Sequence, residues 1–282
     1  METYKIIKDV KNLPRELKIS LQNLVDECEL AHNKTLESHI DPFEDKKALV
    51  LLNGQDVEGV VFFEEQNKIL YIDILYVSYA SRKKGYGKKL LQVLNKVGKE
   101  NGFEKIELVV RRDNKTALNL YQKLNFIKYK SVDESVVSMT KYVDNNVYIL
   151  GGILFELLKE NNGVVNPEKI EFSPKFTKYL KSENAEEIIE KKLKSKTLSL
   201  AIKILKAKEN GKISEESLRH ITRYAKSEQD IFGDKVYIDN VEFLKDSDKK
   251  TLAKAFSVLD VVKNLKLQND LELEEKNFLK DK

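Results

Sequence analysis

The sequence predicts an α+β protein in which a mostly antiparallel sheet, flanked by helices, precedes a mostly helical region. Three observations support this class. Short apolar runs rich in β-branched and aromatic residues recur between residues 47 and 143. Segments with apolar residues at helical spacing lie between those runs. After Val143, long charged amphipathic stretches replace the strand-like runs. We therefore expect one domain over residues 1–143 and a mainly α-helical domain over residues 144–282.

The first domain is expected to run in the order β-α-β-β-β-α-β-α-β-β. It opens with a strand within residues 3–10 and an amphipathic helix within residues 13–32, whose apolar face includes Cys28. Three apolar runs separated by polar turns predict a hairpin meander. A helix that ends near Gly102 and a helix capped by Asn114 alternate with the later strands. The remaining strands are expected at residues 47–54, 57–65, 69–77, 105–110, 125–131 and 135–143.

The second region begins with the apolar run "VYILGGILFELL" at residues 147–158. This run is too short to span a bilayer and contains a glutamate, which indicates a buried strand or helix. Amphipathic helices are expected at about residues 185–209, 214–227 and 247–268, with one or two short strands in residues 234–244. The C-terminal "LELEEKNFLKDK" is expected to fray.

Composition excludes several classes of protein. The 282 residues include 50 Lys and Arg against 46 Asp and Glu, and neither half is strongly basic, so we expect no nucleic-acid partner. A single cysteine excludes an internal disulfide and a site built on several cysteines, which favours the reducing cytosol. The N-terminal "METYKIIKDV" is too polar for a signal peptide. We expect a soluble, cytoplasmic protein with no membrane partner.

The stretch "SRKKGYGKKLL", residues 81–91, follows a predicted strand and opens a helix. It is not a P-loop, because Gly87 is followed by two lysines and no hydroxyl residue. It is not a dinucleotide-binding turn either, since position 90 is Leu where that pattern needs Gly or Ala. What remains is a strand, the pattern RxxGxG and a helix, whose first N–H groups face an anion. Alone, this pattern also fits the solvated start of an ordinary helix.

A second motif gives the loop its context. Residues 114–126, "NKTALNLYQKLNF", read N-x-x-A-x-x-x-Y-x-K-x-x-F. With both motifs in this order, residues 3–143 resemble the GNAT family of acetyl-CoA-dependent N-acetyltransferases. Asn125 stands where the family usually has Gly, and Asn tolerates the left-handed conformation of that turn. The resemblance implies a mixed sheet whose fourth and fifth strands splay apart, with acetyl-CoA as acyl donor.

The resemblance also implies roles for particular residues. The pyrophosphate of coenzyme A would lie on the N–H groups of the glycine loop, and its pantetheine arm against the fourth strand and Asn114. The expected coenzyme-binding residues are Leu75, Val77, Arg82, Lys83, Lys84, Gly85, Tyr86, Gly87, Lys88 and Asn114. Tyr121 falls where the family places the general acid that reprotonates the leaving thiolate, a role that suits a phenol with a pKa of about 10. The alternative is that Tyr121 is only a core aromatic residue.

The attacking amine must lose a proton. Asp73 on the fourth strand is the expected base, with Glu64 and Glu65 on the third strand as competitors, although strand carboxylates are commonly solvated or structural. His32 and His39 lie where the family forms its acceptor wall, but their spacing does not fit a metal site, and we expect no metal.

We expect an N-acetyltransferase in which a primary amine attacks the thioester directly in a ternary complex. A non-catalytic acyl-CoA sensor or interaction scaffold is the alternative, and the pairing of Tyr121 with Asn114 favours the enzyme. The acceptor is a small amine or a protein amino group; acidic residues within the acceptor-facing segment 30–46 favour a cationic one, and segment 131–136 carries no readable specificity. The C-terminal helices carry no catalytic motif and are candidates for a homodimer or protein-partner interface.

Overall fold

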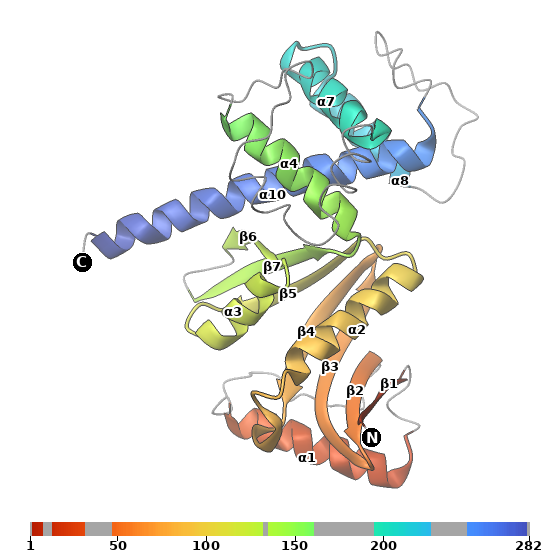
Figure 1. Cartoon of the computed structure of the whole chain (residues 1–282), viewed down its shortest axis with the longest axis vertical. Helices are drawn as coiled ribbons and strands as arrows, with labels where there is room; N and C mark the ends of the chain where they lie inside the picture. Colours follow the sequence, from red (N-terminus) through yellow and green to blue (C-terminus); the bar gives the residue numbers. More distant parts are fainter. Residues whose placement is uncertain are drawn as a thin grey trace. The chain divides into compact units, whose positions relative to one another are not determined.

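The computed structural model describes residues 2–7, 13–31, 47–131, 135–160, 195–226 and 247–280. The chain divides into two compact units, Met1–Asp144 and Asn145–Lys282, drawn in Figure 1.

The first unit contains the expected succession of strands and helices, which confirms its α+β class (Figure 1). A short 3-10 turn, η2 (Tyr79–Ser81), lies between β4 and α2. The strands are β1 (Glu2–Ile7), β2 (Lys47–Asn53), β3 (Asp56–Gln66), β4 (Ile69–Val77), β5 (Lys105–Arg111), β6 (Ile127–Ser131) and β7 (Val136–Tyr142). The helices are α1 (Arg15–Ala31), α2 (Tyr86–Glu100) and α3 (Lys115–Lys123).

The strands form one seven-stranded sheet in the order β1-β2-β3-β4-β5-β7-β6. Neighbouring strands are antiparallel except for β4 and β5, which are parallel. The sheet is therefore mixed and mostly antiparallel, as expected. The helix α2 connects the parallel pair, because two parallel strands need a crossover connection.

Helices cover both faces of the sheet. Because strand side chains alternate between the two faces, each strand can contribute side chains to a core cluster on either side. Leu49 and Leu51 of β2 pack in one cluster with residues of α2 and α3. Ala48 and Val50 of the same strand pack on the other face with residues of α1, among them Cys28. Cys28 is buried in this second cluster, which confirms its expected place in the core.

Two turns have the backbone that the sequence predicts. Gly102 follows α2 with a φ of 74°, the left-handed conformation that glycine adopts without steric cost. Asn125 has a φ of 65°, so the turn between α3 and β6 keeps the left-handed conformation expected of it.

Three β-bulges interrupt the sheet, and each leaves one residue without an opposite partner. Glu58 of β3 lies between the residues paired with Leu51 and Leu52. Asp73 of β4 lies between the residues paired with Phe62 and Phe63. Tyr129 of β6 lies between the residues paired with Met139 and Ser138. A bulge bends its strand and redirects side chains, and bulges are frequent beside active sites.

The second unit is helical in its described part. Its helices are α4 (Asn145–Glu160), α7 (Lys196–Glu209), α8 (Glu215–Lys226) and α10 (Lys249–Lys280). The apolar run at residues 147–158 is thus a helix. The expected helix over 185–209 is described only from Lys196 onward, and the strands expected in 234–244 lie outside the described residues.

The prediction that the C-terminal segment frays is wrong, because α10 continues to Lys280. Its Leu, Glu and Lys residues are strong helix formers, and Gln268 donates a 3.0 Å hydrogen bond to Glu272 one turn later. The helix α10 packs against α4, α7 and α8. The crossing of α4 and α10 is close at Gly151, where any Cβ would overlap the side chain of Val261.

Among the described residues, none of the helices combines the length and apolar composition needed to cross a membrane.

Candidate active site

The strands β4 and β5 separate halfway along their length. They pair only from Ile69 with Lys105 to Ile72 with Leu108. Beyond this point β4 remains paired with β3, and β5 with β7, but β4 and β5 no longer pair with each other. The edge of β4 from Asp73 to Val77 therefore faces a gap, which is the splay that the resemblance implies. An unpaired strand edge offers backbone N–H and C=O groups to an extended ligand.

The loop after β4 is held by a carboxylate of the neighbouring strand. Glu58, the bulged residue of β3, accepts hydrogen bonds from the hydroxyls of Ser81 and, at 3.3 Å, of Ser78. The Ser81 hydroxyl in turn accepts a 3.2 Å hydrogen bond from Lys84. These hydrogen bonds, with Ser81 the main donor, lower the pKa of Glu58 from its ordinary value. The bulge thus fixes the first turn of the glycine loop.

The side chain of Arg82 is directed toward β4. Its guanidinium lies 5.2 Å from the ring centres of both Tyr76 and Tyr79, and its Nε donates a 3.3 Å hydrogen bond to the carbonyl of Val77. Its own backbone N–H donates to Tyr79 within the 3-10 turn, at 3.3 Å. The N–H of Arg82 therefore already has a partner within η2, and the coenzyme-binding role expected of Arg82 stays a prediction.

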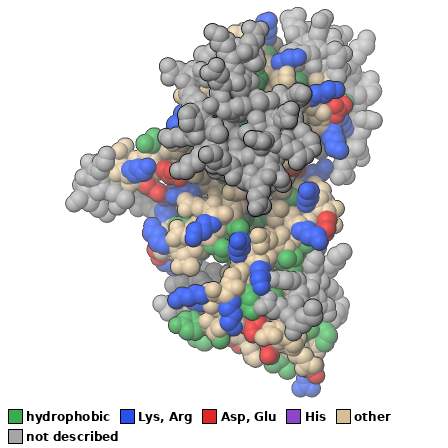
Figure 2. All heavy atoms as spheres, in the orientation of Figure 1, with side chains coloured by type: hydrophobic (Ala, Val, Ile, Leu, Met, Phe, Trp, Pro, Cys, Tyr) green, Lys and Arg blue, Asp and Glu red, His purple; other side chains and the backbone are tan. Residues whose placement is uncertain are grey.

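Several residues after Arg82 have backbone N–H groups that the loop itself does not use. Lys83 and Gly85 have φ values of 64° and 82°, and Gly85 is the N-cap of α2. Within the described part of the chain, the N–H groups of Lys83, Lys84, Gly85, Gly87 and Lys88 donate to no backbone carbonyl. Lys83, Lys84 and Lys88 are exposed, and Figure 2 shows Lys and Arg side chains grouped over the face that carries α2. Free N–H groups at a helix N-terminus, surrounded by cations, suit a phosphate group.

Two residues of this loop have close apolar neighbours. Tyr86 is buried in the core cluster, and the ammonium groups of Lys84 and Lys89 lie 5.8 and 5.3 Å from its ring centre. A Cβ on Gly87 would lie 3.3 Å from the Leu120 side chain of α3, so the glycine allows α2 to approach α3 closely.

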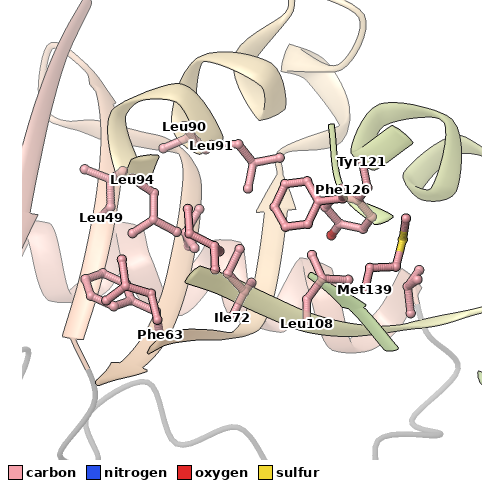
Figure 3. Packing of buried hydrophobic residues seen from close by; sticks show 14 of the residues in the cluster. Leu49, Phe63, Ile72, Leu90, Leu91, Leu94, Leu108, Tyr121, Phe126 and Met139 are labelled. Atoms are coloured by element: carbon pink, nitrogen blue, oxygen red, sulfur yellow. The ribbon is translucent and has the colours of Figure 1, made fainter. Parts of the chain in front are cut away.

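Tyr121 projects from α3 into the core beneath the strand gap. It is only 7% exposed and belongs to the cluster that contains Ile72 and Leu108, the last pair before β4 and β5 separate (Figure 3). Its ring lies 5.4 Å from that of Phe126. Its hydroxyl makes no hydrogen bond to any described residue, and it is not one of the fully enclosed polar atoms of the described chain. Burial raises the pKa of Tyr121 to about 12, so the phenol is protonated at neutral pH.

Asn114 has a structural task in α3, and its expected contact with coenzyme A stays a prediction. It is the N-cap of α3, and its side-chain oxygen accepts a 3.1 Å hydrogen bond from the N–H of Ala117. Only its amide Nδ2 is left to donate to a ligand.

Asp73 is exposed at its bulge, at the first unpaired position of β4. It lines a pocket of about 240 Å³ on the sheet face opposite α2 and α3. The other residues that line this pocket are Tyr71, Ile72, Glu107, Leu108, Val109 and Tyr129. The two competing carboxylates have partners on or beside β3: Glu65 forms a 2.5 Å ion pair with Lys47, and Glu64 accepts a 3.2 Å hydrogen bond from Gln66.

Three polar residues of this pocket, Glu107, Tyr129 and Tyr71, were not among the candidates that the sequence offered. Glu107 on β5 is 8% exposed and accepts a 3.1 Å hydrogen bond from the Tyr129 hydroxyl. Tyr71 on β4 also donates to Glu107, and both burial and Glu107 raise its pKa. A glutamate inside the apolar run "KIELVV" was the available signal, since a carboxylate in a buried strand needs partners.

His32 and His39 lie outside the described residues.

A glycine loop that opens a helix beside a split pair of parallel strands, with a buried phenol below the split, is the arrangement of an acyl-CoA-dependent acyltransferase. A comparison with protein-family models makes the assignment more specific, because residues 18–126 match the model described as the Acetyltransferase (GNAT) family. This part of the chain is a GNAT acetyltransferase domain, which confirms the resemblance, the acyltransferase class and acetyl-CoA as donor. A comparison with curated protein sequences found no match.

Solved structures with a similar fold cover about half of this chain. One is a GNAT-family acetyltransferase from Staphylococcus aureus Mu50, with 16% identity and a TM-score of 0.42 over 50% of this chain and 100% of the other. Another is the ribosomal-protein-S18-alanine N-acetyltransferase from Escherichia coli, with 16% identity and a TM-score of 0.38 over 51% of this chain and 94% of the other. A third is the PaiA N-acetyltransferase from Thermoplasma acidophilum in complex with coenzyme A, with 17% identity and a TM-score of 0.39 over 50% and 99%.

Proposed function

We propose that the protein transfers an acetyl group from acetyl-CoA to a primary amine, a small molecule or a protein amino group, by direct attack in a ternary complex. The observation that carries the proposal is the Tyr121 side chain, which is buried in the core cluster below the strand gap and whose hydroxyl has no hydrogen-bond partner among the described residues. A phenol kept neutral by burial is a proton donor, and at this place the group that receives its proton is a leaving thiolate.

In this reaction the amine nitrogen forms a bond to the thioester carbonyl carbon while the carbon–sulfur bond breaks. The departing sulfur takes a proton from Tyr121, and the nitrogen loses one to Asp73. Asp73 is exposed at the first residue of β4 beyond its pairing with β5, so it reaches solvent and can release that proton. The products are the acetamide and free coenzyme A; Asp73 releases its proton to solvent and Tyr121 regains one from solvent, so no other reactant is required.

The coenzyme would be held by the groups that the loop leaves available. These are the N–H groups of Lys83, Lys84, Gly85, Gly87 and Lys88 for the pyrophosphate, and the backbone at Leu75 and Val77, with the Asn114 amide, for the pantetheine arm. The Val77 carbonyl keeps one lone pair for this purpose after accepting from Arg82.

The test is release of free thiol from acetyl-CoA by the full chain, across a panel of amines, peptides and cell extract, beside calorimetric titration with coenzyme A. Thiol release that depends on an added amine would support the proposal. Binding of coenzyme A without turnover on any acceptor would instead favour a non-catalytic sensor or scaffold. Absence of coenzyme A binding would overturn both.

We further propose that residues 144–282 form a separate domain that recruits a protein partner or a second copy of the chain, and that the protein works in the cytosol. The support is that the N-terminal unit contains the whole GNAT match, and that the single cysteine excludes an internal disulfide. A chain truncated after Asp144 that kept the activity, acceptor range and oligomeric state of the full chain would contradict the first idea. Recovery of the protein from the membrane or secreted fraction of its cells would contradict the second.

A further inference from the structure

The pocket beside Asp73 is built around a buried carboxylate. Glu107 points from β5 to the sheet face opposite α2 and α3, since its neighbours Ile106 and Leu108 belong to the core cluster on the α2 side. Its Oε2 accepts a 3.1 Å hydrogen bond from the hydroxyl of Tyr129. Tyr71, its register partner on β4, donates a second, and the Thr140 hydroxyl donates a third to Oε1 at 3.5 Å. A buried carboxylate with such partners is a built site rather than a solvated surface group.

These hydrogen bonds determine what the pocket offers to a ligand. An ionised carboxylate only accepts hydrogen bonds, so the hydrogens of both phenols point to Glu107. The phenol oxygens of Tyr71 and Tyr129 can still accept a hydrogen bond, although that of Tyr129 also accepts one from Ser138. Asp73 adds a second carboxylate to the same pocket. The polar side chains of the lining are therefore all hydrogen-bond acceptors, and a polar ligand here must be a donor. The charge of the two carboxylates and the tyrosine rings favour a cation.

The two carboxylates are also separated along the sheet. Glu107 is level with Tyr71, and Asp73 is two residues further along β4, which corresponds to roughly 7 Å. The side chain of Val109 forms an apolar wall of the pocket, and it is 58% exposed although it lies within a strand. A ligand that reaches from one carboxylate to the other would cover this exposed apolar surface with its methylene groups.

We propose that the acceptor carries two ammonium groups separated by a short methylene chain, and that Glu107, Tyr71 and Tyr129 bind the one that does not react. This inference rests on the proposed acetyl transfer, because it places the reacting amine at Asp73. The substrate class is an α,ω-diamine or a chain with two such amino groups, with its nitrogens roughly 6–8 Å apart, the span of the two carboxylates. A four- or five-carbon diaminoalkane has this spacing.

The experiment compares a five-carbon diaminoalkane with the corresponding monoamine as acceptors for the full chain. The expected kcat/KM ratio of diamine to monoamine is at least about 10, because a charge-assisted hydrogen bond is lost with the monoamine. Glu107→Gln is expected to lower this ratio by about 10- to 100-fold. Glu100→Gln, which removes a carboxylate at the exposed end of α2, is the matched control and should keep the ratio.

A second variant keeps the test independent of folding. If Glu107→Gln does not fold, Tyr129→Phe removes a single hydroxyl from the same site, and a several-fold fall in the ratio is expected. A diamine-to-monoamine kcat/KM ratio near one in the wild type, or one that these variants leave unchanged, would overturn the inference and leave acetyl transfer intact.

Calorimetric titration with the diamine in the presence of coenzyme A separates the inference from the proposed function. If neither amine is turned over, binding of the diamine that requires Glu107 would uphold the cation site and count against acetyl transfer. If neither turnover nor Glu107-dependent binding is seen, the inference fails.

Discussion

The Nη2 of Arg82 donates a hydrogen bond of 2.9 Å to the hydroxyl of Tyr76, so the first cation of the glycine loop is turned back onto the strand that precedes it. The Tyr76 hydroxyl in turn donates to the Glu27 carboxylate of α1 at 3.2 Å, and Glu27 also accepts the N–H of Tyr79 at 2.5 Å. The loop is therefore held in shape by the first helix of the chain. Arg82 acts as a positioning residue, and its planar group suits this task.

We predict that Arg82→Lys weakens coenzyme A binding nearly as much as Arg82→Ala, because lysine keeps the charge but cannot stack between two rings while donating to two acceptors. Each variant should lose about 1–2 kcal/mol of unfolding free energy. Calorimetry and urea unfolding measure the two effects. Full coenzyme binding by Arg82→Lys would show that the charge alone matters.

Gly85 and Gly102 form a matched pair. Both have a left-handed backbone, with φ values of 82° and 74°, and a Cβ would meet nothing within 4 Å at either position. Alanine should therefore cost about 1–2 kcal/mol of unfolding free energy at each site through backbone strain alone. Only Gly85→Ala should weaken coenzyme A binding, by about 10-fold or more, since it alters the N–H groups at the start of α2. Equal coenzyme affinities in the two variants would argue against the phosphate assignment.

Tyr121→Phe should lower kcat by about 10²–10⁴-fold with little change in coenzyme affinity, because it removes the proton donor and keeps the ring. Burial raises the pKa of Tyr121 to about 12, and the acid must be protonated to act. The active form is thus fully present below about pH 11, and ionisation of Tyr121 should add no alkaline decline to kcat between about pH 7 and 10. The measurement is kcat against pH for both proteins. A decline in that range that is abolished in Tyr121→Phe would contradict this account.

The single cysteine should be nearly inert in the folded protein. Burial, followed by the charge of Glu29, raises the pKa of Cys28 to about 11, and only the thiolate reacts quickly. At pH 8 the thiolate fraction is about 10⁻³, so an aromatic disulfide reagent should modify the folded chain at least about 100-fold more slowly than the unfolded chain. Similar rates in 0 M and denaturing urea would show that Cys28 is accessible. The slow rate also keeps the background of a thiol-release assay low.

Adjacent glycines of α4 provide a test of packing in the second unit. A Cβ on Gly151 would overlap Val261 of α10, whereas one on Gly152 would meet nothing within 4 Å. Gly151→Ala should therefore destabilise the protein by about 1–3 kcal/mol. Gly152→Ala should be neutral or stabilising by up to about 1 kcal/mol, because alanine is the better helix former. Thermal unfolding of both variants measures the difference, and equal melting temperatures would mean that α4 and α10 do not cross closely at this point.

Much of the first unit could be predicted from local patterns. Alternation and helical spacing gave the order of its elements, and two short motifs placed the glycine loop and Tyr121. The role of Glu107 could not be read in this way, because its partners Tyr129 and Thr140 lie on β6 and β7, and a single sequence does not show that β7 pairs with β5. Bulges leave no local signal either, so the positions of Asp73 and Glu58 in their strands required the structure.

The bulge at Asp73 has a consequence for insertions and deletions. Leu70 and Ile72 face the α2 side of the sheet, and so do Leu75 and Val77, although the two pairs differ in parity along the strand. Asp73 is the inserted residue that changes the phase. Deletion of Asp73 would leave every apolar side chain of β4 on its present face and would remove only the carboxylate. The proposed general base is thus a residue that the packing of β4 does not need.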